Sequence, residues 1–80
     1  MIMRAKMRCH SVEPCGDGEI LRFGCVAKSS AYPEDGSDED NSFARWSPDG
    51  DTRINVQNPA LKGKIAVGDT FYVDFTKVEA

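Results

Sequence analysis

The chain has 80 residues, of which 40% are hydrophobic and 29% are charged, and its formal net charge is −3 at pH 7. This length and composition are typical of one ordinary globular domain with a small core, and they exclude a disordered chain. The negative balance argues against a general nucleic-acid binder, which normally carries an excess of lysine and arginine.

The amino-terminal segment and the cysteines bear on where the protein works. No run of about 18 apolar residues could cross a membrane, and residues 1–6 lack the apolar core of a signal peptide. The cysteines Cys9, Cys15 and Cys25 are odd in number and contain no Cys-x-x-Cys pair, which fits a reducing compartment. We therefore expect a soluble intracellular protein with free thiols.

Three segments alternate between apolar and polar residues, which is the period of a strand that is buried on one face. They are residues 3–10, 19–28 and 52–57. The interval 13–18 carries a proline and two glycines and predicts a hairpin between the first two strands. Gly24 is expected to mark a bulge or the close approach of another backbone.

The best-specified strand lies near the carboxyl end. A Gly-Asp turn at 68–69 precedes Phe71, Val73 and Phe75, which alternate with polar or amphipathic residues and predict a half-buried strand. We expect Phe71→Ala or Phe75→Ala to lower the stability by about 3 to 5 kcal/mol, as for a core aromatic ring. The expected inward-facing set is Met3, Met7, Leu21, Phe23, Phe43, Ile54, Val56, Phe71, Val73 and Phe75.

Two shorter features complete the predicted fold. Residues 43–46 precede a Ser-Pro-Asp-Gly turn at 47–50 and are expected to form a short strand. Residues 58–63 begin with a capping asparagine and a proline and end with glycine, which predicts one helical or 3₁₀ turn. Together these elements predict a single all-β domain over residues 1–80, a small antiparallel five-stranded barrel or sandwich with one short helical turn.

A long acidic loop at about residues 29–42 is the first candidate for a contact surface, because loops of this length are usually mobile or functional. Aromatic residues are enriched where interfaces concentrate energy. The predicted partner-binding residues are Tyr32, Glu34, Asp35, Asp38, Glu39, Asp40 and Trp46. A solvated loop and a core Trp46 are the rival interpretation. If the loop only makes contacts, deleting residues 35–40 should leave the melting temperature nearly unchanged.

A second hypothesis makes the chain a small barrel that binds single-stranded nucleic acid. Arg4, Lys6 and Arg8 lie on one face of the first predicted strand together with His10, where they could contact phosphates. Tyr72 or Trp46 would stack on bases. The acidic total makes nucleic acid the weaker partner hypothesis, behind a protein partner.

Catalytic and metal sites have little support in the sequence. Cys9, His10, Cys15 and Cys25 have the chemistry of zinc ligands, but their spacing lacks a close pair, and alternation places Cys9 and His10 on opposite faces. The acidic loop lacks the calcium-hand pattern. We predict a protein that is not an enzyme and needs no cofactor or metal. An enzyme assembled only on oligomerisation stays open, with no residue nominated.

Four segments between residues 38 and 77 carry a resemblance: Asp38-Glu39-Asp40-Asn41-Ser42-Phe43, Trp46-Ser47-Pro48, Asn58-Pro59-Ala60 and Gly68-Asp69-Thr70-Phe71-Tyr72-Val73-Asp74-Phe75. In order and spacing they resemble a family of small, mostly uncharacterised proteins of tailed bacteriophages and prophages. The resemblance implies a viral origin and a compact β fold, and it carries no catalytic residues.

These observations give an expected function. We expect a phage accessory protein that binds another protein through its loops and sheet edge. The partner would be a virion subunit or a host defence or host-takeover target. The expected location is the host cytoplasm or the virion, with no membrane contact, and self-association into a homo-oligomer is a further option.

Overall fold

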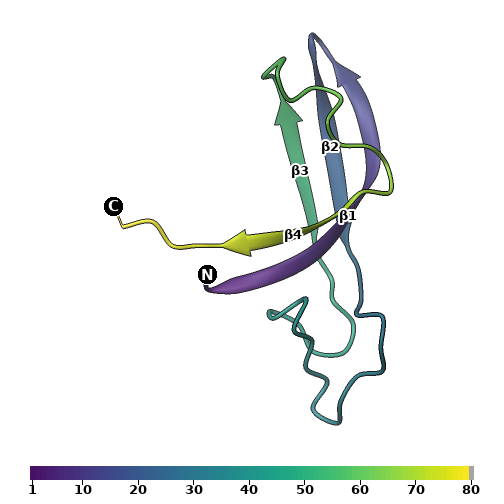
Figure 1. The fold of residues 1–80 in the computed structure, drawn as a ribbon, viewed down its shortest axis with the longest axis vertical. Coiled ribbons are helices and arrows are strands. Elements are labelled where there is room, and N and C mark those ends of the chain that lie inside the picture. Colours follow the sequence, from purple (N-terminus) through teal and green to yellow (C-terminus); the bar gives the residue numbers. More distant parts are fainter. Residues whose placement is uncertain (80) are drawn as a thin grey trace.

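The computed structural model describes residues 1–79, which form four strands and no helix (Figure 1). The strands are β1 (Met3–Cys15), β2 (Gly18–Cys25), β3 (Asp51–Val56) and β4 (Thr70–Phe75). They build one antiparallel sheet in the order β3-β2-β1-β4. The predicted all-β class is confirmed. Among residues 1–79 the sheet is open and has four strands, so the predicted five-stranded barrel or sandwich is not confirmed.

β1 belongs to two differently directed parts of the sheet. Its residues 3–8 pair with β4, whereas its residues 7–15 pair with β2. The register with β2 shifts between Cys9 and Ser11, so His10 is an extra residue on β1, as in a β-bulge. Figure 1 shows β1 curving, so that β4 and the start of β1 run across the direction of β2 and β3. The bulge lies in β1 rather than at Gly24, which instead faces the His10 ring.

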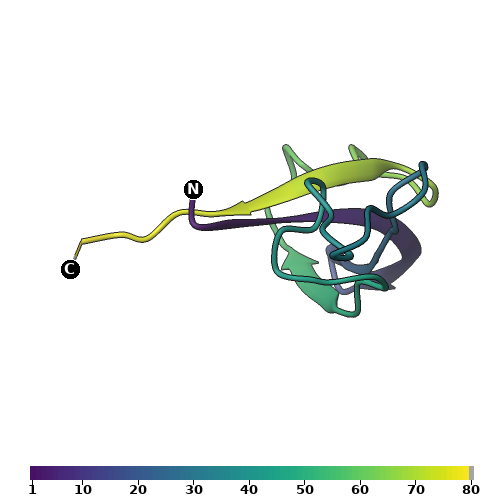
Figure 2. The ribbon, with the colours of Figure 1, turned by 90° about the horizontal axis from the view of Figure 1, so that it is seen from below.

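The paired ends of the chain project from the rest of the sheet. The amino-terminal end of β1 and the segment after β4 leave in the same direction (Figure 2). The radius of gyration is 14.6 Å, larger than the roughly 12 Å of a compact domain of this length. Hydrophobic residues near both ends therefore stay in contact with solvent, namely Met1, Ile2, Phe75 and Val78.

The buried core is small and is formed by residues of β1 and β2. Its members are Ala5, Met7, Cys9, Leu21 and Phe23. From the predicted inward-facing set, Met7, Leu21 and Phe23 are buried; Met3, Val56 and Val73 are half-buried; Phe43, Ile54, Phe71 and Phe75 are exposed.

The aromatic residues of β4 contribute less to this core than we predicted. Phe71 is 38% exposed and Phe75 is 47% exposed, because no further strand in the described part of the chain covers them. Phe71 contacts Phe23 edge-on, with ring centroids 6.1 Å apart. A half-exposed ring supplies only part of the hydrophobic free energy of a buried one. The expected loss of about 3 to 5 kcal/mol for Phe71→Ala or Phe75→Ala is therefore too large.

Residues 43–46 form turns rather than the predicted strand. The Ala44 N–H donates to the Asn41 carbonyl oxygen at 2.9 Å, and the Trp46 N–H donates to the Gly36 carbonyl oxygen at 2.8 Å. Trp46 adopts a φ of 65°, in the left-handed region. These local bonds leave no extended segment that could pair with the sheet.

Residues 58–63 contain the predicted cap without the predicted helix. Asn58 accepts the Ala60 N–H on its side-chain oxygen at 3.0 Å, and the Leu61 N–H donates to the Asn58 carbonyl oxygen at 3.0 Å. Gly63 has a φ of 80°, which is outside the helical region and ends the turn. No helix among residues 1–79 is long and apolar enough to span a membrane.

Candidate functional site

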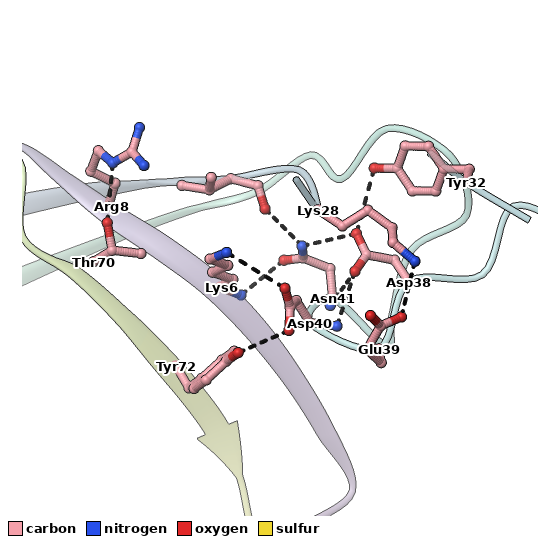
Figure 3. Close-up of polar contacts among 11 residues, drawn as sticks. Lys6, Arg8, Lys28, Tyr32, Asp38, Glu39, Asp40, Asn41, Thr70 and Tyr72 are labelled. Atoms are coloured by element: carbon pink, nitrogen blue, oxygen red, sulfur yellow. Dashed lines mark hydrogen bonds and ion pairs between the residues drawn. The ribbon is translucent and has the colours of Figure 1, made fainter. Parts of the chain in front are cut away.

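Asn41 anchors the loop between β2 and β3, residues 26–50, which we call the 26–50 loop. Its side chain is fully buried. Its Oδ1 accepts the Lys6 N–H at 2.8 Å, and its Nδ2 donates to the Val26 carbonyl oxygen at 2.8 Å and to Asp38 Oδ2 at 3.1 Å (Figure 3). The amide of Asn41 thus joins β1, the end of β2 and the middle of the loop.

Asp38 stabilises the same loop from inside. Only 3% of the residue is exposed, and its Oδ1 accepts the N–H groups of Asp40 at 2.9 Å and of Asn41 at 3.2 Å. Burial raises the pKa of the Asp38 carboxyl, but the hydrogen bonds from the Asn41 side chain and from these two N–H groups lower it further, so the pKa lies below its usual value. Asp38 is therefore ionised at neutral pH. Because a deletion of residues 35–40 would remove this anchor, we now expect that deletion to destabilise the protein.

The loop also provides hydrogen-bond partners for the backbone of β1 where β1 does not pair with β2. The Ser42 N–H donates to the Arg4 carbonyl oxygen at 2.9 Å, and the Arg4 N–H donates to Ser42 Oγ at 2.8 Å. The Val26 N–H donates to the Lys6 carbonyl oxygen at 2.9 Å. Pairing of β1 with β2 begins only at Met7, so these contacts take the place of a strand beside the start of β1.

Trp46 and Tyr32 form an aromatic pair on the 26–50 loop. Their ring centroids are 5.9 Å apart. Gly36 lies directly against Trp46, so that a Cβ at Gly36 would fall 2.5 Å from the indole ring. Burial, followed by the nearby Asp38 carboxylate, raises the pKa of Tyr32. Trp46 is 50% exposed, so it is not a core residue and presents part of its ring to solvent.

Acidic side chains lie around this aromatic pair. Glu34, Asp35 and Glu39 are exposed. Glu39 pairs with Lys28 Nζ at 3.1 Å, and Lys28 Nζ in turn lies 5.9 Å from the Tyr32 ring centroid. An N–H hydrogen bond from Ser37 lowers the pKa of Asp35, and a backbone hydrogen bond followed by Lys28 lowers that of Glu39. An open hollow of about 360 Å³ adjoins them, lined by Ser37, Asp38, Glu39, Ser42, Ala44 and Arg45.

The structure thus separates the seven predicted partner-binding residues. Asp38 is buried, and Asp40 is half-buried and turned toward β1 and β4. The remaining five residues have side chains that solvent reaches at least in part: Tyr32, Glu34, Asp35, Glu39 and Trp46. We call these five the loop surface.

The cations of the alternative nucleic-acid face are engaged with neighbouring side chains. Arg4 makes two hydrogen bonds to the Asp74 carboxylate, at 2.7 and 2.9 Å, and its guanidinium carbon lies 4.3 Å from the Tyr72 ring centroid. Lys6 Nζ lies 3.5 Å from Asp40 Oδ2. Hydrogen bonding to Asp74 raises the pKa of Arg4, and that to Arg4 lowers the pKa of Asp74. Two of the three predicted phosphate contacts therefore already have a carboxylate partner.

The other members of that face are more loosely held. Arg8 Nε donates to Thr70 Oγ1 at 3.1 Å, and the exposed His10 occupies the bulge. Tyr72 donates its hydroxyl to Asp40 at 2.9 Å, and this hydrogen bond raises the pKa of Tyr72. The edge of the Tyr72 ring is thus fixed between β4 and the 26–50 loop (Figure 3).

The cysteines are free thiols. Cys9 is buried, and Cys15 and Cys25 are half-buried. Burial, followed by the charges of Asp49 and Asp51, raises the pKa of Cys25, which disfavours a reactive thiolate at neutral pH. In the part of the chain that the structure describes, no group of three or more His, Cys, Asp or Glu side chains is placed to hold a metal ion.

Sequence reasoning missed Asn41 and Ser42 as residues that hold the site. Their signal is local: an Asp three residues before an Asn, in a polar segment, is typical of an Asx turn in which the Asp side chain accepts backbone N–H groups. The contacts of Asn41 with Lys6 span 35 positions in the chain, and no local pattern encodes them.

No protein-family model, no curated protein and no solved structure matches this chain.

Proposed function

We propose that this chain is a non-enzymatic protein that binds another protein through the loop surface. The observation that carries the proposal is Trp46, which is half exposed although Gly36 and Tyr32 hold its ring in place. A fixed, exposed indole loses little conformational entropy on binding, and Trp is among the residues that contribute most to interfaces.

The chemistry of the loop surface defines the kind of partner. The 26–50 loop carries six Asp and Glu residues against Lys28 and Arg45, so the surroundings of the Tyr32–Trp46 pair are negatively charged although Glu39 is paired with Lys28. Complementary charge steers association and selects the partner. The partner is therefore a protein with an apolar recess for the indole and lysine or arginine side chains around it.

The phage family that the sequence resembles supports an accessory role for this binding. On that basis the partner is a virion subunit or a host protein used in defence or takeover, and the site of action is the host cytoplasm or the virion. The anchoring of the 26–50 loop by Asn41 also supports the proposal, because a pre-ordered loop avoids the entropic cost of ordering on binding.

The alternative function, single-stranded nucleic-acid binding, has weaker support. Arg4 and Lys6 are paired with Asp74 and Asp40, so phosphate contacts would first have to replace these carboxylates. Titration with a labelled oligonucleotide at two salt concentrations tests it. Affinity that falls steeply with salt would favour this function, since phosphate contacts release counterions.

Capture from lysates of phage-infected cells tests the proposed function. The immobilised chain, Trp46→Ala and Glu34→Lys are compared by quantitative mass spectrometry of the bound proteins. Leu61→Ala and Asp17→Lys are matched controls, because both positions are exposed and lie outside the loop surface. We expect one protein to be lost with both loop variants and kept with both controls. Equal capture by all five chains would refute the proposal.

A further inference from the structure

β4 is an edge strand with one unpaired side. Among residues 1–79, whose sheet order is β3-β2-β1-β4, only β1 lies beside it. On the other side of β1, the backbone groups of Arg4 and Lys6 bond to the 26–50 loop, so those of Ala5 and Met7 face β4. Successive residues of a strand direct their backbone groups to opposite sides. The direction of the β4 groups follows from this pairing.

The free N–H and C=O groups of β4 belong to Thr70, Tyr72 and Asp74. Val73 is opposite Ala5 and Phe71 is opposite Met7, so these two direct their backbone groups toward β1. The residues between them direct theirs outward. A strand that pairs with this edge must therefore place its own unpaired N–H and C=O groups opposite these three residues.

The sequence of β4 leaves this edge unprotected. Natural edge strands usually carry lysine, proline or a bulge that prevents further pairing. β4 has none of these, and its single charge, Asp74, is neutralised by Arg4. The other edge strand, β3, carries both Asp51 and Arg53. The β4 edge is thus the better candidate for β-strand addition.

We propose that β4 pairs antiparallel with β4 of a second copy of this chain, with Val73 opposite the second copy's Val73. This register brings the free N–H and C=O groups of Tyr72 in one copy opposite those of Asp74 in the other. It also places Phe71 opposite Phe75 and, beyond the strand ends, Asp69 opposite Lys77, each pair occurring twice. The contact is isologous, as expected for a two-fold dimer.

The two neighbouring registers that also place the free backbone groups of the two β4 strands opposite each other are less favourable than this one. A shift that places Asp74 opposite the second copy's Asp74 puts like charges directly across from each other, which is destabilising. A shift that places Tyr72 opposite Tyr72 sets Asp69 opposite Phe75 and leaves Lys77 without a carboxylate. Charge complementarity therefore selects the register centred on Val73.

The proposed dimer accounts for the exposed aromatic residues of β4. Phe71, Val73 and Phe75 share the face of β4 that carries the core, since they lie opposite Met7, Ala5 and Met3 of β1. In the dimer the apolar face continues from one copy into the other. Aromatic pairs directly across an antiparallel ladder contact each other and stabilise it.

Sedimentation and amide exchange test the dimer without substitutions. We expect the mass to rise with concentration to twice that of the monomer. In the same range the amides of Tyr72 and Asp74 should become protected from exchange, while the outward-facing amides of β3 should not. A monomer at every concentration up to millimolar, or protection confined to β3, would overturn the proposal.

Cross-linking tests the register. Val73 would form a non-hydrogen-bonded pair with Cα atoms about 4.5 Å apart, within the roughly 4.4 to 6.8 Å of a disulfide. Val73→Cys should therefore give a linked dimer on mild oxidation, with the bond at position 73 located by peptide mass spectrometry. Val67→Cys, exposed and outside the ladder, is the matched control. Cross-linking of the control to the same extent would overturn the register.

Charge reversal at Lys77 gives an independent readout. Lys77→Glu should weaken the dimer roughly tenfold at low salt, because two attractive pairs with Asp69 become repulsive. Lys62→Glu makes the same change at an exposed position of the 58–63 turn and should leave the dimer unchanged. Equal dissociation constants for both variants would contradict the Asp69–Lys77 pairing.

Discussion

The Asn41 side chain takes the place of a strand partner for Lys6. Its Oδ1 accepts the Lys6 N–H at 2.8 Å, at a point of β1 that β2 does not reach. The same amide donates to the Val26 carbonyl oxygen, where β2 has just ended. One buried side chain thus completes the hydrogen bonding of two backbone segments, and it keeps the 26–50 loop against the sheet.

This relationship predicts the effect of removing the Asn41 amide. Asn41→Ala should lower the free energy of unfolding by about 2 to 3 kcal/mol, because it leaves the Lys6 N–H and the Val26 carbonyl without their partner. Urea denaturation followed by circular dichroism measures the loss. Asn55→Ala, at an exposed position of β3, should stay within about 0.5 kcal/mol of the parent chain. Similar losses in the two variants would mean that the Asn41 contacts do not stabilise the fold.

The pKa of Asp38 predicts a pH dependence at the acid end. It is lower in the folded chain than in the unfolded chain, so folding favours the ionised carboxylate. The resulting stabilisation is complete above the unfolded value of about 4 and is lost as the pH falls through the folded value. Between pH 5 and pH 2 the parent chain should therefore lose more stability than Asp38→Asn. Asp17→Asn removes a carboxyl group at an exposed position outside the 26–50 loop and serves as the matched control.

The positions of the strands were predicted better than their arrangement into a barrel or sandwich. Local alternation located the cores of β1, β2, β3 and β4, because period-two burial is visible within six residues. The fifth strand at 43–46 was wrong because the bonds of Ala44 and Trp46 to nearby carbonyls, at Asn41 and Gly36, replace sheet pairing. The helical turn predicted at 58–63 is not confirmed: these residues form only hydrogen-bonded turns and bends, and the positive φ of Gly63 fits the predicted terminating glycine.

The site was predictable only in outline. The acidic loop and its aromatic residues were located from composition, since polar residues and aromatics in a long connection are visible without a structure. The sequence did not show which acidic residues of the loop are buried and which are exposed. Asp35 and Asp38 have the same chemistry and lie three positions apart, but one is exposed and the other is buried beside Asn41. The difference arises through Asn41, the local partner of Asp38, which is held against β1 by its hydrogen bond with Lys6, 35 positions away, and no local pattern encodes that contact.

The uneven burial of the phenylalanines predicts unequal costs of truncation. Phe23 is 6% exposed and Phe75 is 47% exposed. Phe23→Ala should cost about 3 to 5 kcal/mol, as for a buried ring that leaves a cavity. Phe75→Ala should cost about 1 to 1.5 kcal/mol, since only about half of its surface leaves water on folding. Denaturation at micromolar concentration measures both in the monomer, and equal costs would contradict the open sheet.

The contact of Gly36 with Trp46 predicts how the loop surface can be disturbed selectively. A Cβ at Gly36 would lie 2.5 Å from the indole ring, whereas a Cβ at Gly63 would have nothing within 4 Å. Both glycines have a positive φ, 74° and 80°, so alanine carries a similar backbone cost of about 1 to 2 kcal/mol at either position. The difference between the two variants therefore isolates the contact with the ring.

Gly36→Ala should consequently destabilise the chain by at least about 1 kcal/mol more than Gly63→Ala, or push the indole into solvent. Thermal denaturation measures the first outcome. The fluorescence of Trp46, the single tryptophan, measures the second, as a shift of its emission to longer wavelength. The Gly63→Ala spectrum should match that of the parent chain, because that position lies outside the 26–50 loop. Equal stability and identical spectra for both variants would contradict a fixed ring, and with it the pre-ordered surface that the proposed function needs.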